Sequence, residues 1–110
     1  MRTVFEQCFI AGWDHADGNA AISKGLITGQ EVKLRREAEN KFDTNAIEVM
    51  WAGASPMIKL GYVPRVSNGA LALLLDEGRA YKARVVEVNP ASSNPWKKCA
   101  IRVEIEEESK

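Results

Sequence analysis

Hydrophobic and polar residues alternate along several short stretches of the chain, as they do in strands with one buried face. The alternation is clearest over residues 31–36, 45–51, 58–62 and 101–106. Two further stretches, residues 3–14 and 80–89, alternate less regularly, and the first of them is rich in Phe, Ile and Val. The pattern therefore predicts six strands.

Residues 65–77 follow a different period, because their leucine, alanine and valine residues form a broad apolar stripe at helical spacing. Pro64 suits the entry to a helix and Gly78 suits its exit. Asp76 and Glu77 oppose the helix dipole near the C-terminal end, so we expect this helix to depend on packing.

Many short strands with a single helix predict a mainly β fold. We expect a small six-stranded β-barrel, OB-like or SH3-like, with one α-helix covering an opening. A length of 110 residues is that of one domain. We therefore expect residues 1–110 to form a single domain, with an acidic tail at residues 106–110.

The net charge is zero, because 15 Lys and Arg balance 15 Asp and Glu. Four of the acids lie within the last eight residues, and the rest of the chain carries 14 bases and 11 acids. This balance neither supports nor excludes an anionic partner. No apolar run approaches the ~20 residues of a membrane helix, and the N-terminus lacks a signal peptide's apolar stretch. We expect a cytoplasmic protein without a membrane partner.

Residues for catalysis or metal binding are sparse. Cys8 and Cys99 lie outside any CxxC motif, and His15 is the only histidine, so these side chains supply at most three zinc ligands. The chain has no G-x-x-x-x-G-K-[ST] loop and no histidine at a recognisable spacing from a nucleophile. We expect two buried cysteines, no metal, no cofactor and no enzymatic activity.

Three segments carry a more specific signal in combination. They are F-I-A-G-W-D-H-A-D-G at residues 9–18, V-K-L-R-R-E-A-E-N-K-F-D-T-N-A-I-E-V at residues 32–49, and L-G-Y-V-P-R at residues 60–65. Their order and spacing resemble the HIRAN domain family, whose core reads R-E-x-x-N-x-[YF]-D-x-N-A-I-x-V, followed by L-G-Y-[VIL]-P-R before a helix. The resemblance covers residues 5–105 and implies a modified OB-fold.

The resemblance also implies a function. In eukaryotic fork-remodelling ATPases the HIRAN domain binds single-stranded DNA and captures its 3′-hydroxyl end. We therefore expect a nucleic-acid-binding module for single-stranded DNA or DNA 3′ ends, in repair or stalled-fork processing, beside a partner nuclease or ATPase. A protein-interaction module without DNA binding, or an accessory to a partner hydrolase, stays open because fold does not fix function. The choice between DNA and RNA and the oligomeric state are open too.

The core motif supplies three candidate site residues. The resemblance places Asp43 beside the terminal 3′-hydroxyl and Phe42 on a base. A carboxylate accepts a hydrogen bond from a sugar hydroxyl and repels a phosphate, and an aromatic face stacks on any base for ~1–3 kcal/mol. Asn40 contacts a base or the backbone in the same interpretation. The structural alternatives are a turn for Asp43 and Asn40 and a core position for Phe42.

The first segment supplies two more candidates. His15 matches an aromatic position of the DNA-binding members, and Trp13 is either a stacking platform or a core residue. Asp14 departs from those members, which carry a basic residue there. Since an acid facing a phosphate is unfavourable, Asp14 weakens the expectation of a phosphate contact at this edge.

The remaining candidates are a tyrosine and several bases. Tyr62 and Arg65 flank the start of the predicted helix, where a hydroxyl or a guanidinium can reach a phosphate. Arg35 and Arg36 lie in the second predicted strand, and Lys33 shares a strand face with Arg35. These bases form either a phosphate-binding stripe or a solvated outer face.

Overall fold

The computed structural model describes residues 1–107 of the chain. The strands are β1 (Arg2–Phe9), β2 (Val32–Arg36), β3 (Ile47–Trp51), β4 (Ile58–Tyr62), β5 (Tyr81–Val88) and β6 (Cys99–Ile105). The α-helices are α1 (Gly18–Ser23) and α2 (Asn68–Asp76), and the short 3-10 helices are η1 (Trp13–His15) and η2 (Pro95–Lys97).

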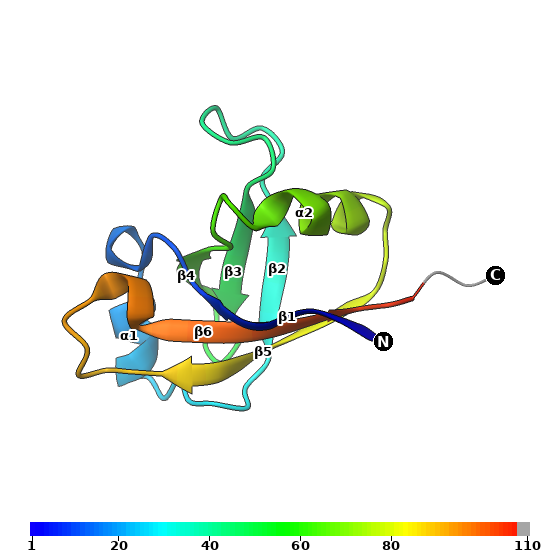
Figure 1. The fold of residues 1–110 in the computed structure, drawn as a ribbon. Helices are drawn as coiled ribbons and strands as arrows, with labels where there is room; N and C mark the ends of the chain where they lie inside the picture. The colour runs from blue at the N-terminus through cyan, green and yellow to red at the C-terminus, as the bar shows by residue number, and fades with distance from the viewer. Residues whose placement is uncertain (108–110) are drawn as a thin grey trace.

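The six strands form two antiparallel three-stranded sheets, in the orders β1-β6-β5 and β2-β3-β4. The strands of one sheet run across those of the other (Figure 1). Single bridges join the sheets at both seams, between Ala11 and Tyr62 and between Glu31 and Arg84. The predicted mainly β fold with six strands is confirmed, but single bridges at the seams do not close the sheets into a continuous barrel.

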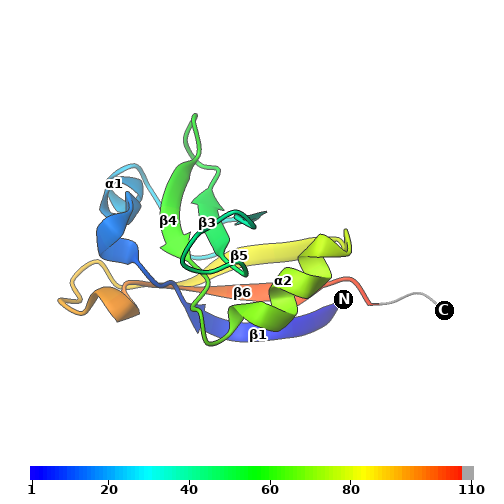
Figure 2. The same ribbon diagram turned by 90° about the horizontal axis from the view of Figure 1, so that it is seen from above.

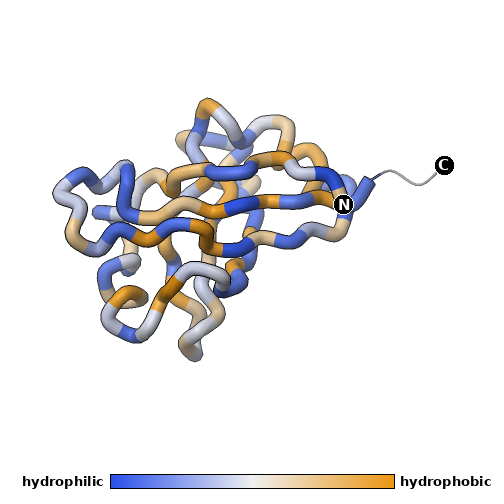
Figure 3. The backbone as a smooth tube through the Cα atoms, turned by 60° about the horizontal axis from the view of Figure 1, so that its bottom comes forward, coloured by the Kyte–Doolittle hydropathy of each residue, from blue (hydrophilic) through white to orange (hydrophobic). Residues whose placement is uncertain are grey.

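The core lies between the two sheets, and the alternating pattern of the sequence accounts for it. In β6, Ile101, Val103 and Ile105 are fully buried, whereas Arg102 and Glu104 lie on the outer face. Figure 3 shows the same alternation of hydrophobic and hydrophilic positions along the strands. β3 is the central strand of its sheet, and every one of its residues is buried.

Three elements depart from the prediction. The first strand ends at Phe9 instead of residue 14, because Gly12 adopts a left-handed conformation with φ 72° and starts η1. The helix expected at residues 65–77 is confirmed over the shorter range of α2, after a turn in which the Ser67 amide donates to the Pro64 carbonyl. Helix α1 was not predicted, because six residues are too few to display a helical period.

Gly61 in β4 permits the close approach of Ala11 to this strand, and the candidate site lies beside this contact. Its φ is +147°, and a Cβ at this position would lie 2.3 Å from the carbonyl oxygen of Ala11. Ala11 and Tyr62 exchange two backbone hydrogen bonds of 2.8 and 2.9 Å across this close approach. The glycine thus places residues 11–12 beside the end of β4.

Helix α2 lies across one end of the β-structure (Figures 1 and 2), as the predicted covering helix should. Leu71 and Ala72 are its buried apolar residues. The connection between β2 and β3 projects from the same end of the molecule (Figure 1). Glu106 and Glu107 are exposed, and the rest of the predicted acidic tail lies outside the described residues. Within residues 1–107, no helix is long and apolar enough to cross a membrane.

Candidate nucleic-acid interface

A pocket of about 390 Å³ opens between the β2–β3 connection, the end of β4 and the turn before α2. It gathers five of the nine predicted site residues, which are Asn40, Phe42, Asp43, Tyr62 and Arg65. The remaining wall is small and mostly apolar and consists of Ala11, Gly12, Ala46 and Val63. Residues of all three sequence segments that carry the resemblance therefore meet in one place.

Asn40 shapes the connection that carries the pocket. Its Oδ1 accepts hydrogen bonds from the backbone amides of Phe42 (2.8 Å) and Asp43 (3.0 Å), as asparagine does in turns. Its Nδ2 donates to Glu37. The amide thus holds the turn, and the turn leaves the Phe42 side chain 85% exposed at the pocket.

Asp43 is an anchored carboxylate that remains 21% exposed. Its Oδ2 accepts a hydrogen bond from Nδ2 of Asn68 (2.8 Å), and its Oδ1 accepts one from the Asn45 amide (2.9 Å). These two bonds lower the pKa of Asp43 below its ordinary value of 3.8. Nε of Arg65 lies 4.0 Å from Oδ2. The site therefore presents a fixed anionic acceptor beside a cation.

Arg65 belongs to the turn between β4 and α2 and reaches back over the connection. Its guanidinium donates to the backbone carbonyl of Phe42. The side chain is otherwise largely open to solvent. It can therefore offer its remaining N–H groups to a phosphate at the rim of the pocket.

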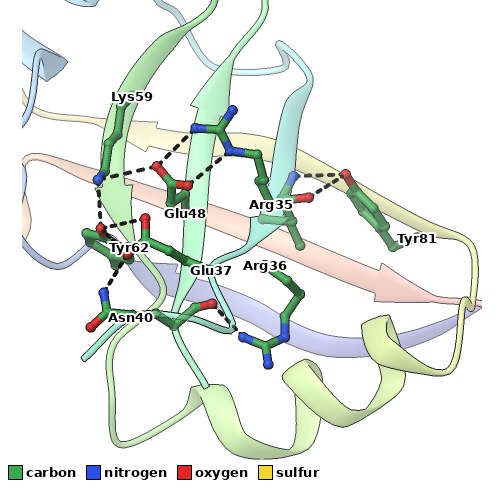
Figure 4. Close-up of polar contacts among 10 residues, drawn as sticks. Arg35, Arg36, Glu37, Asn40, Glu48, Lys59, Tyr62 and Tyr81 are labelled. Carbon is green, nitrogen blue, oxygen red and sulfur yellow. Dashed lines mark hydrogen bonds and ion pairs between the residues drawn. The ribbon is translucent and has the colours of Figure 1, made fainter. Parts of the chain in front are cut away.

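Tyr62 contributes its ring to the pocket, whereas its hydroxyl is engaged within the protein. The hydroxyl accepts a hydrogen bond from Nζ of Lys59 (2.7 Å) and donates to Glu37, 3.0 Å from Oε1. Glu37 also accepts the hydrogen bond from Asn40 (Figure 4). This one carboxylate therefore links Tyr62 at the end of β4 to the β2–β3 connection. The hydroxyl of Tyr62 is therefore occupied within the protein, and Nζ of Lys59 also lies over the ring, 4.2 Å from its centroid.

Glu48 anchors the other end of this network on the outer face of the β2-β3-β4 sheet. Its side chain is only 7% exposed and lies between Arg35 and Lys59 (Figure 4). Arg35 forms a double hydrogen bond to it at 3.0 and 3.2 Å, and Nζ of Lys59 is 3.3 Å away. Burial alone would raise the pKa of Glu48, but these partners outweigh burial and lower it. Arg35 therefore lies outside the pocket and pairs with Glu48.

The guanidinium of Arg36 forms its hydrogen bonds within the protein. Nε and Nη2 bind the carboxylate of Asp76 in α2 at 2.9 and 3.2 Å. The guanidinium also donates to the carbonyls of Thr44 (2.9 Å) and Ala46 (2.7 Å). These bonds occupy most of its donors, so the structure gives Arg36 a structural role, fastening the connection to α2.

Trp13 and His15, the last two predicted residues, differ in burial although both lie in η1. The Trp13 side chain is buried, its Nε1 donates to Oδ1 of Asn19 (3.0 Å), and Gly18 leaves room for the ring. The ring is therefore almost entirely covered, as the core alternative expects, although Trp13 also contributes to the wall of a second hollow. His15 is exposed and lines this hollow of about 210 Å³ together with Trp96, whose side chain is 65% exposed. Gly12 lines both hollows.

Several residues of the site carried no individual signal in the sequence. Glu48 occupies a polar position of an alternating strand, and Asn68 belongs to the first turn of a helix. Glu37 belongs to the R-E-x-x-N motif, and this motif is the one sequence signal that could have identified it.

In the described part of the chain, no group of three or more His, Cys, Asp and Glu side chains could hold a metal ion.

Comparisons with known proteins identify the family. The chain matches the HIRAN domain family over residues 5–108. It belongs to this family. HIRAN domains are in general nucleic-acid-binding modules, so the resemblance seen in the motifs is confirmed at that level. No curated protein matches the chain.

Two crystal structures share the HIRAN fold. A protein from Lactobacillus plantarum is 28% identical, with a TM-score of 0.69, and the match covers 94% of this chain and 95% of that protein. The HIRAN domain of human HLTF is 19% identical, with a TM-score of 0.64, over 88% of this chain and 71% of that domain. At this identity the likeness to HLTF concerns the fold.

Proposed function

We propose that this HIRAN domain binds single-stranded DNA and captures its 3′-hydroxyl end in the 390 Å³ pocket. The observation that carries the proposal is the meeting of three complementary groups around one cavity. Phe42 supplies an exposed aromatic face, Arg65 an exposed cation and Asp43 an anchored carboxylate.

Each group suits one part of a strand terminus. An exposed aromatic face stacks on any base, and a guanidinium binds a phosphate. A carboxylate has only acceptor atoms, so it can accept a hydrogen bond from a terminal sugar hydroxyl. The same carboxylate repels a phosphate, and it therefore favours a strand end over an internal nucleotide.

The hollow beside the pocket extends this surface. Trp96 and His15 are exposed and lie next to Gly12, which belongs to both hollows. The nucleotides that precede the terminal one can stack there. Exposed Asp14 lines the same hollow and opposes a phosphate. In the cell, the module would bring a partner nuclease or ATPase to DNA ends during repair or at stalled forks.

The decisive experiment is a titration by fluorescence anisotropy at low salt. The probes are a 5′-labelled strand ending in a 3′-hydroxyl, the same strand with a 3′-phosphate, and the corresponding duplex. We expect preference for the 3′-hydroxyl strand, and we expect Asp43→Asn to remove the preference because the amide is neutral. Thr44→Ala is the matched control in the same connection, since only its backbone carbonyl is used.

Absence of binding to all three probes by a folded protein would contradict DNA binding. Equal binding of the two single strands would leave a single-strand binder and refute end capture. Asp14→Arg tests the neighbouring hollow: affinity should rise, and the slope of log affinity against log salt should steepen by about 0.7 for one added phosphate contact.

A protein-interaction module on the same fold is the second candidate. It is favoured by the outer side of α2 and the turn before it, where Val66 is 96% exposed and Leu73 is also exposed. Exposed apolar side chains of this kind can contribute to a protein interface. Failure of the DNA titration would direct the search to this surface.

A further inference from the structure

Asn68 is a buried polar residue next to the pocket, and the sequence does not single it out. It is the first residue of α2 and is only 2% exposed. Burying an amide side chain costs free energy unless a hydrogen bond compensates for it. The compensating partner is Oδ2 of Asp43, at 2.8 Å from Nδ2.

This bond differs in kind from the other bond to Asp43. The Asn45 amide, which binds Oδ1, belongs to the same connection and moves with it. Asn68 belongs to α2, and Arg36 also ties the connection to this helix through Asp76. The Asn68 side chain therefore fixes the carboxylate relative to the pocket wall. Each carboxylate oxygen still has one acceptor position left for a ligand.

The charge of the donor matters as much as its position. A lysine or arginine in hydrogen-bond contact would neutralise Asp43 and admit a phosphate, whereas an amide donates without adding charge. Arg65 forms an ion pair with Asp43 at 4.0 Å, which is beyond hydrogen-bond distance, so its charge attracts the carboxylate without using an acceptor position of Oδ2. Asp43 thus keeps its negative charge at the place where a strand terminus would lie.

We propose that Asn68 is a positioning residue that sets the selectivity of the pocket for a hydroxyl terminus over a phosphate terminus. It does so by holding Asp43 as a fixed, ionised acceptor through a donor that carries no charge of its own. The inference rests on the proposed function, in which Asp43 faces the terminal sugar.

The first test needs no ligand. Carbon-detected NMR follows the Asp43 carboxyl group through a pH titration of wild type, Asn68→Ala and Asn45→Ala. In Asn68→Ala the pKa of Asp43 should rise toward 3.8, because a bond to the ionised form is lost. Asn45→Ala is the matched control, since Asp43 uses only the backbone amide of Asn45. An unchanged pKa of Asp43 in Asn68→Ala would overturn the proposal.

The second test measures selectivity as the ratio of affinities for the 3′-hydroxyl and 3′-phosphate strands. Asn68→Ala should reduce the ratio roughly 10- to 150-fold, as for the loss of one hydrogen bond to a charged group. Asn45→Ala should preserve it. Thermal unfolding of both variants reports whether each remains folded.

Asn68→Asp separates positioning from packing, because its side chain has nearly the same shape. Two adjacent carboxylates share a proton, which raises the pKa of the pair. When protonated, the introduced carboxyl group can donate to Asp43 and rescue binding of the 3′-hydroxyl strand. Affinity of this variant should therefore approach wild type at low pH and fall as the pH rises, whereas wild-type affinity changes little.

The outcomes distinguish this inference from the proposed function. Selective wild-type binding that Asp43→Asn abolishes, with Asn68→Ala and Asn68→Asp both behaving as wild type, overturns the role of Asn68 alone. Wild type that binds both termini equally refutes end capture and the selectivity role together. The altered titration of Asp43, the reduced ratio and the pH-dependent rescue support the proposal jointly.

Discussion

An aromatic side chain in water forgoes the free energy that burial would provide, about 1.5–3 kcal/mol for a phenylalanine. Phe42 is exposed to water because Asn40 accepts hydrogen bonds from the amides of residues 42 and 43 and closes a turn beneath the ring. The fold therefore gains little from this ring. Its exposure beside the pocket is consistent with a ring kept for a ligand.

Phe42→Ala should accordingly separate binding from stability. We expect the free energy of unfolding to change by less than about 0.5 kcal/mol, as for other exposed positions. Affinity for single-stranded DNA should fall by about 1–3 kcal/mol through the loss of one stacked base. Denaturant titration and fluorescence anisotropy measure the two effects, with exposed Ile27→Ala as control. A large loss of stability with unchanged affinity would contradict this assignment.

Glu48 is the opposite case, a charge placed inside the protein. Its pKa is lowered from an ordinary 4.5, because the hydrogen bonds from Arg35 and Lys59 outweigh the effect of burial. A group with a depressed folded pKa stabilises the protein fully above its unfolded pKa, and this contribution is lost as the pH falls through the folded value.

Stability of the wild type should therefore decline below about pH 4.5 more steeply than that of Glu48→Gln, which has no proton to bind at this position. Glu48→Gln should be less stable than wild type at neutral pH, because Arg35 and Lys59 lose their charged partner. Urea unfolding across this pH range provides the comparison. Parallel pH profiles for the two proteins would refute the assignment.

At the scale of elements, the β2–β3 connection is a long segment held by side chains from its neighbours. Arg36 from β2, Arg65 from the turn before α2 and Asn68 from α2 each bind it. The opposite wall of the pocket depends on β4, whose Gly61 allows the close approach to Ala11. The site is therefore held by neighbouring elements that are far apart in the sequence.

Gly61→Ala should break the seam between β4 and Ala11. A Cβ would lie 2.3 Å from the Ala11 oxygen and 2.6 Å from Cγ2 of Ile10, so the strands must separate. We expect a loss of at least about 2 kcal/mol of unfolding free energy. Gly25→Ala is the control, since it has φ +107° but nothing within 4 Å of its Cβ. If thermal unfolding showed the same loss of stability in Gly61→Ala and Gly25→Ala, backbone strain and not the steric clash would account for the effect.

At the scale of the whole molecule, two sheets enclose one core, and both cysteines lie in it. Burial raises the pKa of Cys8 to about 11. Burial, with a smaller effect from the charge of Glu87, raises the pKa of Cys99 to about 12. Since the thiolate is the reactive form, both thiols should be inert while the protein is folded.

Thiol labelling should consequently report global unfolding. We expect neither cysteine to react with a thiol reagent in native buffer, and both to react together as denaturant unfolds the core. Mass spectrometry of samples quenched along the titration counts the labels. Early labelling of Cys8 alone would show that β1 separates before the rest of the fold.

Local pattern was enough to determine the strands, the apolar faces and the family. Alternation fixes which side chains of β6 are buried, and the motifs around residues 36–49 and 60–65 identify a HIRAN domain. These properties depend on neighbours along the chain, so periodicity and spacing record them. Asn40, Phe42 and Asp43 were found this way because they lie in one short motif.

Tertiary contacts decided what each of those residues does. Trp13 and Phe42 are both aromatic residues next to charged ones, yet the first packs over Gly18 and the second stands in water. Arg36 binds Asp76, 40 residues away, and Asn68 reaches Asp43 across 25 residues. Hydrogen-bond partners and exposure arise from segments that meet only in the folded chain, and no local pattern encodes them.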